Sequence, residues 1–252
     1  MKPLENRIAV VTGASRGIGA AAASALAAAG AHVITVARSA EALEQSARAI
    51  EAAGGVCTPF PADITRPDAV AALAKMVGER FGRLDMLFGN AGALGGVLPV
   101  TGIDDAVWQA TFAVNVTANF LLLKALDGLL RRSDAGRVLF VSSGAAWKAN
   151  PRWGVYSVSK AALEVLARTY AAEVADTPVK VMLLSPGPIR TGMRAEAVPG
   201  EDPNTLKTPE DLAPHIVRLL SPDWPHTGKI YDFPAGGVVK NPGVPQAMDA
   251  GA

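Results

Sequence analysis

Cysteine, histidine and net charge are all scarce in this chain. Cys57 is the single cysteine among 252 residues, which excludes an internal disulfide and fits a reducing compartment. The chain has 24 basic and 23 acidic residues, and its net charge of +1 gives no electrostatic reason to expect nucleic acid or an anionic membrane as a partner. Neither Cys57 nor the three histidines have the spacing of metal ligands, so no metal site is expected.

Long hydrophobic runs are also missing. The N-terminal stretch MKPLENRIAVV lacks the apolar core of a secretory signal, and no uncharged apolar run is long enough to span a bilayer. The apolar segment 20–29 is mostly alanine, as expected of a packed helix. These absences predict a soluble cytoplasmic protein.

Short runs rich in Val, Ile and Leu alternate along the chain with longer helical patterns. Strands are predicted at 7–12, 32–37, 56–61, 84–88, 137–141, 179–184 and 229–232, and helices at 17–29, 40–52, 67–80, 105–131, 156–175 and 209–220. Strands that are apolar along their length and separated by helices predict a parallel sheet covered on both faces. The sequence therefore predicts a single doubly wound α/β domain over 1–252, with a seven-stranded parallel sheet and a flexible tail at 238–252.

Two predicted helices begin with capping chemistry. Thr65 and Thr208 each precede a proline and an acid, as in Thr65-Arg-Pro-Asp68 and Thr208-Pro-Glu-Asp211. A hydroxyl at the cap, an early proline and an acid in the first turn all favour a helix start.

Tyr156 and Lys160 stand four residues apart in the stretch YSVSK. Because residues four apart lie on the same face of a helix, the Lys160 ammonium can lie close to the Tyr156 phenol and favour its ionised form. A free tyrosine has a pKa near ~10, and lowering that pKa by roughly 3 units requires about 4 kcal/mol of differential stabilisation. The pair is a candidate proton donor and acceptor, although the spacing alone also fits a solvated helix face.

Gly13, Gly17 and Gly19 lie in the stretch TGASRGIG, between the first predicted strand and a helix. Glycines there let the backbone turn tightly and approach a pyrophosphate at the positive end of the helix. A glycine cluster can also be a simple turn, but this position between strand and helix favours a dinucleotide loop.

The end of the second predicted strand indicates which dinucleotide is preferred. Sites that prefer NAD usually place an acid about 20 residues beyond the glycines, where this chain has Ala37 and Arg38. Arg16, inside the glycine loop, offers a second guanidinium, and two arginines around one 2′-phosphate form a charge-assisted site. We expect NADP(H) rather than NAD(H), the alternative being that both are ordinary surface arginines.

Together, TGASRGIG and YSVSK resemble the motifs of the short-chain dehydrogenase/reductase family, and the likeness covers residues 7–237. The chain is most similar to bacterial reductases of undefined substrate, with the 3-oxoacyl carrier-protein reductases as better-known relatives. The resemblance implies a Rossmann-type fold, and a homodimer or homotetramer built on the helices near 105–131 and 156–175.

The resemblance also implies roles for individual positions. Ser143 matches the serine that polarises the substrate, and Asn115 matches the asparagine that bends its helix and holds a water in the proton relay. Asn90 follows Gly89 where the family usually has a second asparagine, a departure expected to loosen local hydrogen bonding in the sheet. The implied catalytic residues are Asn115, Ser143, Tyr156 and Lys160. The implied cofactor contacts are Gly13, Ser15, Arg16, Gly17, Ile18, Gly19, Arg38, Asp63, Ile64, Asn90, Ala91, Gly92, Tyr156, Lys160, Pro186, Gly187, Ile189 and Thr191.

These roles imply a specific reaction. Ser143 and Tyr156 would hydrogen-bond the substrate oxygen while hydride moves between its carbon and the nicotinamide, and Tyr156 would give or take the proton. Lys160 would lower the pKa of Tyr156 and hold the nicotinamide ribose, and Ile189 and Thr191 would meet the carboxamide. The expected activity is an NADP(H)-dependent interconversion of a small-molecule carbonyl and a secondary alcohol.

The sequence leaves the substrate open. Pocket walls are expected from 92–99, 145–153 and 192–207, with Trp147 and Trp153 either lining the pocket or packing beneath it. The segment RAEAVPGEDPNTLK lacks periodicity, as a mobile lid would, and Arg194 within it either meets an anionic substrate or is simply solvated.

Other classes of protein fit the sequence less well. A dinucleotide-binding regulator would not need Ser143, Tyr156 and Lys160 together, but it remains an alternative, as does a 3-oxoacyl carrier-protein reductase proper. An enoyl reductase would place its lysine further from the tyrosine. A serine hydrolase would need Gly-x-Ser-x-Gly at a strand-to-helix elbow, which VSSGA does not supply.

Overall fold

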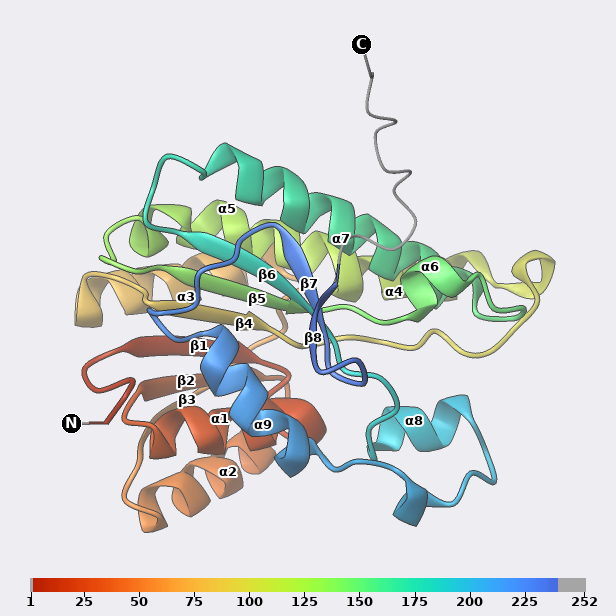
Figure 1. Cartoon of the computed structure of the whole chain (residues 1–252), viewed down its shortest axis with the longest axis horizontal. Coiled ribbons are helices and arrows are strands. Elements are labelled where there is room, and N and C mark those ends of the chain that lie inside the picture. Colours follow the sequence, from red (N-terminus) through yellow and green to blue (C-terminus); the bar gives the residue numbers. More distant parts are fainter. Residues whose placement is uncertain (1, 240–252) are drawn as a thin grey trace.

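The computed structural model describes residues 2–239, and it contains one eight-stranded sheet with helices on both faces (Figure 1). The strands are β1 (Ile8–Thr12), β2 (His32–Ala37), β3 (Val56–Pro61), β4 (Met86–Gly89), β5 (Arg137–Val141), β6 (Lys180–Ser185), β7 (Lys229–Asp232) and β8 (Gly237–Val239). The α-helices are α1 (Gly17–Ala28), α2 (Ala40–Ala52), α3 (Pro67–Phe81), α4 (Asp105–Phe112), α5 (Ala118–Leu130), α6 (Ala145–Lys148), α7 (Gly154–Glu173), α8 (Gly192–Ala197) and α9 (Pro209–Leu219).

The sheet has the strand order β3-β2-β1-β4-β5-β6-β7-β8, with parallel pairing from β3 through β7. Order reverses between β1 and β4, because the chain runs outward to β3 and then returns to the other side of β1. Such a reversal leaves a crevice at the carboxyl ends of the two central strands, where ligands bind in open α/β sheets. The predicted seven-stranded parallel sheet is confirmed, and β8 adds a short antiparallel strand that was not predicted.

Two apolar layers hold the helices to the sheet. One face packs against α1, α2 and α9 through residues such as Leu26, Leu43 and Ile216. The other face packs against α3, α5 and α7 through residues such as Leu73 and Leu126. Figure 1 shows these two helical layers below and above the strands, with α4 and α6 at one end of the upper layer and α8 at the same end below them. Both faces are buried, which explains why the strands are apolar along their length.

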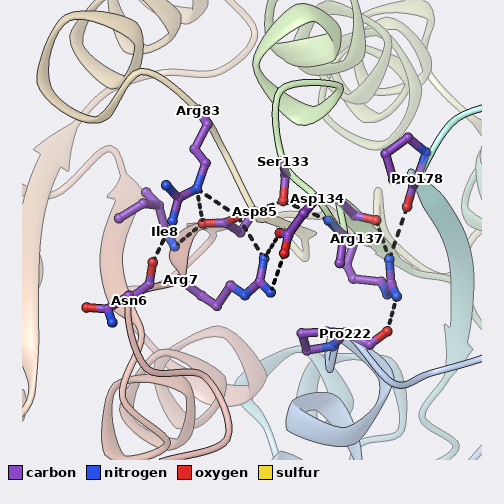
Figure 2. A network of polar contacts seen from close by, with 12 residues as sticks. Asn6, Arg7, Ile8, Arg83, Asp85, Ser133, Asp134, Arg137, Pro178 and Pro222 are labelled. Atoms are coloured by element: carbon purple, nitrogen blue, oxygen red, sulfur yellow. Dashed lines mark hydrogen bonds and ion pairs between the residues drawn. The ribbon is translucent and has the colours of Figure 1, made fainter.

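A polar network lies at the end of the sheet where β1, β4 and β5 begin, opposite the carboxyl ends of the parallel strands (Figure 2). Asp85 is fully buried, and its carboxylate accepts from the Ile8 N–H at 2.8 Å and the Ser133 hydroxyl at 2.6 Å. Arg7 and Arg83 also donate to Asp85, at 3.2 and 3.1 Å. Asp85 therefore ties together the segments that precede three neighbouring strands.

Helix starts agree only in part with the capping predictions. Thr208 forms a full capping box with Asp211 at the start of α9, as predicted. At α3 the predicted early proline and first-turn acid, Pro67 and Asp68, are present, but the predicted Thr65 cap was wrong because the helix begins after Arg66 without a side-chain cap. The Thr65 hydroxyl instead donates to Asp63 at 2.8 Å, since an acceptor two residues earlier competes with the helix end.

The single predicted helix at 105–131 is three pieces. A π-helical segment, η2 (Ala113–Thr117), separates α4 from α5, and Asn115 lies at its centre. The stretch Asp105–Leu130 is long and apolar enough to cross a membrane by length and composition alone, a test that core helices of soluble proteins also pass. Here Leu122, Leu126 and Leu130 are fully buried against the sheet.

The C-terminal prediction covers residues that the structure describes only in part. Val238 and Val239 belong to β8 and so are not part of a loose tail. The remainder of the predicted tail, 240–252, lies outside the described residues.

Candidate active site

A large cleft of about 1510 Å³ lies at the carboxyl ends of the strands. Its walls run from the glycine loop after β1, across the ends of β2, β4, β5 and β6, to α6 and α8. Of the site residues predicted from sequence, all but Gly19 and Asn115 line this cleft. Those two are buried behind its wall. The fold thus brings segments more than a hundred residues apart into one site.

The glycine loop has a shape that side chains would block. Gly13 and Gly17 have φ of 65° and 56°, in the left-handed region that favours glycine. A Cβ on Gly19 would lie 2.2 Å from the Gly13 carbonyl oxygen. Only glycine at position 19 therefore lets α1 approach the end of β1 this closely. The loop therefore leaves backbone N–H groups at the start of α1 free to face a pyrophosphate.

Asn90 holds this loop from β4. Its side-chain amide donates to the carbonyls of Thr12 and Gly13, at 3.0 and 3.3 Å. The Thr12 hydroxyl in turn accepts from the backbone N–H groups of Asn90 and Ala91, at 3.0 and 3.1 Å. Asn90 lines the cleft, but its amide is engaged with the loop, so its first role is to fix the glycine turn.

Gly89 replaces the asparagine expected from the family resemblance. Another residue occupies the space that a side chain at position 89 would take. A Cβ at this position would lie 2.2 Å from the Phe140 ring on β5 and 2.8 Å from the Asn119 side chain. Phe140 is fully buried, and Gly89 pairs with it in the parallel ladder. Gly89 stays in register with Phe140, and glycine here makes room for that neighbouring aromatic ring.

Arg16 and Arg38 both line the nucleotide end of the cleft and both are exposed. Among residues 2–239 neither forms an ion pair. The nearby Asp63 carboxylate accepts from the Thr65 N–H and hydroxyl, which lowers its pKa, and Arg38 adds to that effect. The described residues thus leave two unpaired guanidiniums at this end of the cleft, Arg16 from the glycine loop and Arg38 from the end of β2.

Tyr156 is 8% exposed and its ring faces the cleft from α7. Burial raises the pKa of the phenol, while a hydrogen bond with Ser143 lowers it. The predicted lowering of this pKa depends on Lys160 together with a positively charged cofactor ring, and among the protein atoms burial is the largest influence on the pKa of Tyr156. Within the chain the phenol is thus held in its protonated form.

Lys160 is 3% exposed, and its ammonium does not face bulk solvent. Nζ donates to the Val141 carbonyl at 2.8 Å and lies 5.6 Å from the centre of the Tyr156 ring. Burial lowers the pKa of Lys160 to about 8, and the charge of Glu164 opposes that decrease. One turn of α7 therefore places a cation beside the candidate acid, as the four-residue spacing predicted.

Asn115 lies behind these two side chains in the π-helical segment. Its side chain accepts from the Ala93 N–H at 2.8 Å and donates to the Ala93 carbonyl and to the Ser159 hydroxyl, both at 2.9 Å. The predicted bend at Asn115 is thus present as a local π-helix, a feature common at functional sites. These three bonds fix the strand-end loop at Ala93 against α7.

The loop after β6 forms the wall opposite the glycines. Gly187 has φ of 68°, and Ile189 is buried with a short bridge to Lys207. The Thr191 hydroxyl accepts from Arg194 N at the start of α8, and its methyl group would lie 3.3 Å from a Cβ on Gly17. Thr191 therefore bridges the loop and the nucleotide end of the cleft.

The substrate end of the cleft has an apolar lining. Leu94, Ala145, Tyr156 and Ala197 form a small buried cluster, with Trp153 and Met193 packed against it. The Trp153 and Tyr156 rings meet edge to face with centroids 6.0 Å apart, so Trp153 lines the site. Trp147 does not, because it packs against the core of the sheet.

The segment after Thr191 is folded. It contains α8 and the short 3₁₀ helix η3 (Pro203–Thr205), neither of which was predicted. Arg194 donates two bonds to Glu201, at 2.6 and 2.5 Å, which clamp the segment to itself. Arg194 is therefore paired with a carboxylate of the chain, whereas the sequence suggested either an anionic substrate or solvent as its partner.

Sequence reasoning missed two buried polar residues next to the site. Ser142, directly before Ser143, donates to Glu164 at 2.5 Å. The signal was present, because Glu164 follows Lys160 by four residues and must share its helix face. In the part of the chain that the structure describes, no group of three His, Cys, Asp or Glu side chains is placed to hold a metal ion.

The fold and the cleft together define the class of Rossmann-type α/β proteins, with a glycine loop at the switch point of an open parallel sheet. More specifically, the chain belongs to the short-chain dehydrogenase family, whose conserved region, described as "short chain dehydrogenase", matches residues 7–202.

Relatives across nearly the whole chain support this assignment. The chain is 39% identical over 247 residues to the "Uncharacterized oxidoreductase YciK" of Escherichia coli K12, covering 96% of both chains. It is 37% identical over 195 residues to a 3-oxoacyl-[acyl-carrier-protein] reductase of Synechocystis, covering 77% of this chain and 78% of that one. A short chain dehydrogenase of Escherichia coli CFT073, crystallised with NADPH, has a TM-score of 0.88 at 40% identity, covering 92% of this chain and 98% of that one.

Proposed function

We propose that this protein is an NADP(H)-dependent oxidoreductase that interconverts a carbonyl and a secondary alcohol. The observation that carries the proposal is the buried Tyr156 phenol, in contact with Ser143 and with Lys160 beneath it, in the same cleft as the glycine loop. A binding protein would need the loop but not the three side chains beside it. A bound nicotinamide dinucleotide would supply or accept the hydride.

The residues of the chain would hold the substrate and move the proton. Ser143 and Tyr156 would both donate to one substrate oxygen and so stabilise the negative charge that develops there. Because burial raises the pKa of Tyr156, the phenol is protonated at neutral pH and is ready to donate to a carbonyl that is being reduced.

The shape of the cleft also fits the cofactor. A Cβ at position 13 or 19 would collide with Asn90 and with neighbouring backbone, so glycine lets the loop fold tightly against β4 and present its backbone to a pyrophosphate. Arg16 and Arg38 would hold a 2′-phosphate, and relatives of the chain have been crystallised with NADP and NADPH. Lys160, which lines the same cleft, would hold the nicotinamide ribose.

The first test is a screen of NADPH oxidation by the purified protein against oxoacyl thioesters, diketones, quinones, sugars and steroid ketones. Turnover of ketones supports the proposal, and a strong preference for oxoacyl thioesters would identify a 3-oxoacyl carrier-protein reductase. Tight NADPH binding without turnover across the whole panel would contradict the proposal and favour a dinucleotide-binding regulator.

Replacing Arg38 with Asp should reverse the cofactor preference. The change removes a charge-assisted contact of about 1.5–3 kcal/mol, so kcat/KM for NADPH should fall roughly 10- to 100-fold while that for NADH is maintained or rises. Arg48→Asp is the matched control, because Arg48 lies on the exposed side of α2 outside the cleft. Equal kcat/KM for the two cofactors in the native protein, or an unchanged ratio in Arg38→Asp, would refute the NADP(H) preference.

We also propose a homo-oligomer, either a dimer or a tetramer, built on α4, α5 and α7, which lie on the same side of the sheet (Figure 1). Exposed apolar side chains are concentrated on these helices: Trp108 at 37%, Phe120 at 48%, Val158 at 47% and Val165 at 57%. A second copy of the chain is the expected partner, because an exposed apolar helix face of this kind marks an association surface. Light scattering at micromolar concentration should give at least twice the 25.9 kDa chain mass, and Val165→Glu should reduce it.

The matched control for this surface is Val56→Glu on β3, because Val56 is 53% exposed but lies on the edge of the sheet, away from those helices. A monomeric native protein, or an oligomer that Val165→Glu and Phe120→Glu both leave intact, would contradict the proposed interface.

A further inference from the structure

Glu164 is a buried carboxylate beside the Tyr–Lys pair, and the proposed chemistry does not yet use it. It lies one turn beyond Lys160 on α7 and is 5% exposed. Removing a carboxylate from water is costly unless charges and hydrogen bonds compensate for the lost hydration. A carboxylate at this depth therefore depends on the donors and charges around it.

Both oxygens of Glu164 have donors. The Ser142 hydroxyl donates to Oε1 at 2.5 Å, and Arg168 donates to Oε2 at 3.2 Å from the next turn of α7. Burial raises the pKa of Glu164, whereas the bonds from Ser142 and Arg168 and the charge of Lys160 lower it. A carboxylate that accepts at both oxygens and lies between two cations is suited to the ionised form.

Ser142 connects this carboxylate to the reacting groups. It is fully buried and lies between Val141, whose carbonyl accepts from Lys160, and Ser143, which contacts Tyr156. The end of β5 is thus tied to α7 at two successive residues, by the bonds Lys160 to Val141 and Ser142 to Glu164. These bonds fix where Ser143 stands relative to the phenol.

We infer that Glu164 is a positioning residue for the proposed reaction: it holds the end of β5 against α7 through Ser142, and its charge supports the Lys160 ammonium. The inference rests on the proposed function, because only an oxidoreductase needs Ser143, Tyr156 and Lys160 in fixed register. Glu164 does not line the cleft and so does not touch the substrate.

The surroundings of Lys160 make the electrostatic part testable. The charged or titratable groups near it are Tyr156 and Glu164 on α7, with Arg168 beyond Glu164. The end of β5 and the π-helical segment contribute the neutral Val141 carbonyl, Ser142 and Asn115. Since burial lowers the pKa of Lys160 to about 8 and Glu164 opposes this, the ammonium is held below that pH and lost above it.

Replacing Glu164 with Gln should therefore shift the titration of Lys160 to lower pH. Gln keeps the size and the acceptor for Ser142 but removes the charge, and a nearby opposite charge changes a pKa by about 1 unit or more. The measurement is an NMR titration of ¹³C-labelled lysine in the full chain, with the Lys160 signal identified by its loss in Lys160→Arg. We expect a midpoint near pH 8 in the native protein and about 1 unit lower in Glu164→Gln.

Glu173→Gln is the matched control, because Glu173 lies on the same helix but is exposed, so the Lys160 midpoint should not move. An unchanged midpoint in folded Glu164→Gln would overturn the inference. Where the screen has supplied a substrate, the alkaline limb of kcat/KM should move with that midpoint. The NMR result does not depend on turnover, so a protein without activity but with the shift would contradict only the proposed function.

Ser142→Ala tests the positioning part separately, and it remains available if Glu164→Gln does not fold. It breaks the bond to Glu164 but keeps the charge, so kcat should fall about tenfold or more while the Lys160 midpoint stays near its native value. Native kcat in folded Ser142→Ala would overturn the positioning role.

Discussion

Tyr156→Phe is expected to lower kcat/KM about 10²- to 10⁴-fold, the range that a well-placed general acid contributes. The substitution removes one hydroxyl and leaves the ring, which packs against Trp153 and lies over the Lys160 ammonium. Apolar packing is kept, so the thermal midpoint and the affinity for NADPH should change little. Steady-state kinetics with any accepted carbonyl, together with a fluorescence titration of NADPH, would separate lost chemistry from lost binding.

Tyr170→Phe provides a matched control on the same helix. Tyr170 is 7% exposed, its hydroxyl donates to Asp127 at 2.8 Å, and it lies outside the cleft. The loss of that bond should reduce the free energy of unfolding by about 1 kcal/mol or somewhat more and leave kcat/KM unchanged. Near-native kcat in Tyr156→Phe would remove the role of Tyr156 as proton donor.

The sequence predicted which residues meet in the cleft more accurately than it predicted their hydrogen bonds and pKa shifts. The spacing of Tyr156 and Lys160 correctly places both on one face of α7. It could not show that Lys160 donates to the Val141 carbonyl, since that bond depends on where β5 ends. Nor could it show that burial raises the pKa of the phenol, because desolvation depends on walls contributed by distant segments.

Fold predictions succeeded where a pattern is local and repeated. The apolar runs at β2, β3, β5 and β7 match the predicted strands residue by residue. The π-helical segment around Asn115 was not predictable from propensity, because its geometry depends on bonds to Ala93 and Ser159 from other elements. Short elements such as α8 and β8 lack a periodic signal and form by tertiary contact.

Gly89, which stands where the family usually has asparagine, is explained by its neighbour Phe140. Taken alone, the loss of a side chain in a strand suggests weaker hydrogen bonding. The structure places the Phe140 ring in the space where a Cβ would stand. The two positions therefore act as a pair, and a larger residue at 89 would require a smaller one at 140.

Asp85→Ala is expected to produce the largest loss of stability. Asp85 is fully buried, and its removal leaves the Ile8 N–H and the buried Ser133 hydroxyl without their acceptor, and Arg7 and Arg83 without their shared partner (Figure 2). Orphaned buried donors cost about 1–3 kcal/mol each, so the free energy of unfolding should fall by about 3 kcal/mol or more. For a chain of this size that corresponds to a thermal midpoint lower by about 10 °C, measurable by circular dichroism.

Asp134→Ala is the matched control in the same network, since Asp134 also pairs with Arg7 but its side chain is 77% exposed. Exposed ion pairs contribute little, so this variant should lose no more than about 1 kcal/mol. Similar small losses in both variants would mean that the polar network does not hold the amino ends of β1, β4 and β5 together. Because the network lies at the end of the sheet opposite the cleft, kcat/KM of folded Asp85→Ala should remain native at low temperature, which separates the stability of the fold from the chemistry of the site.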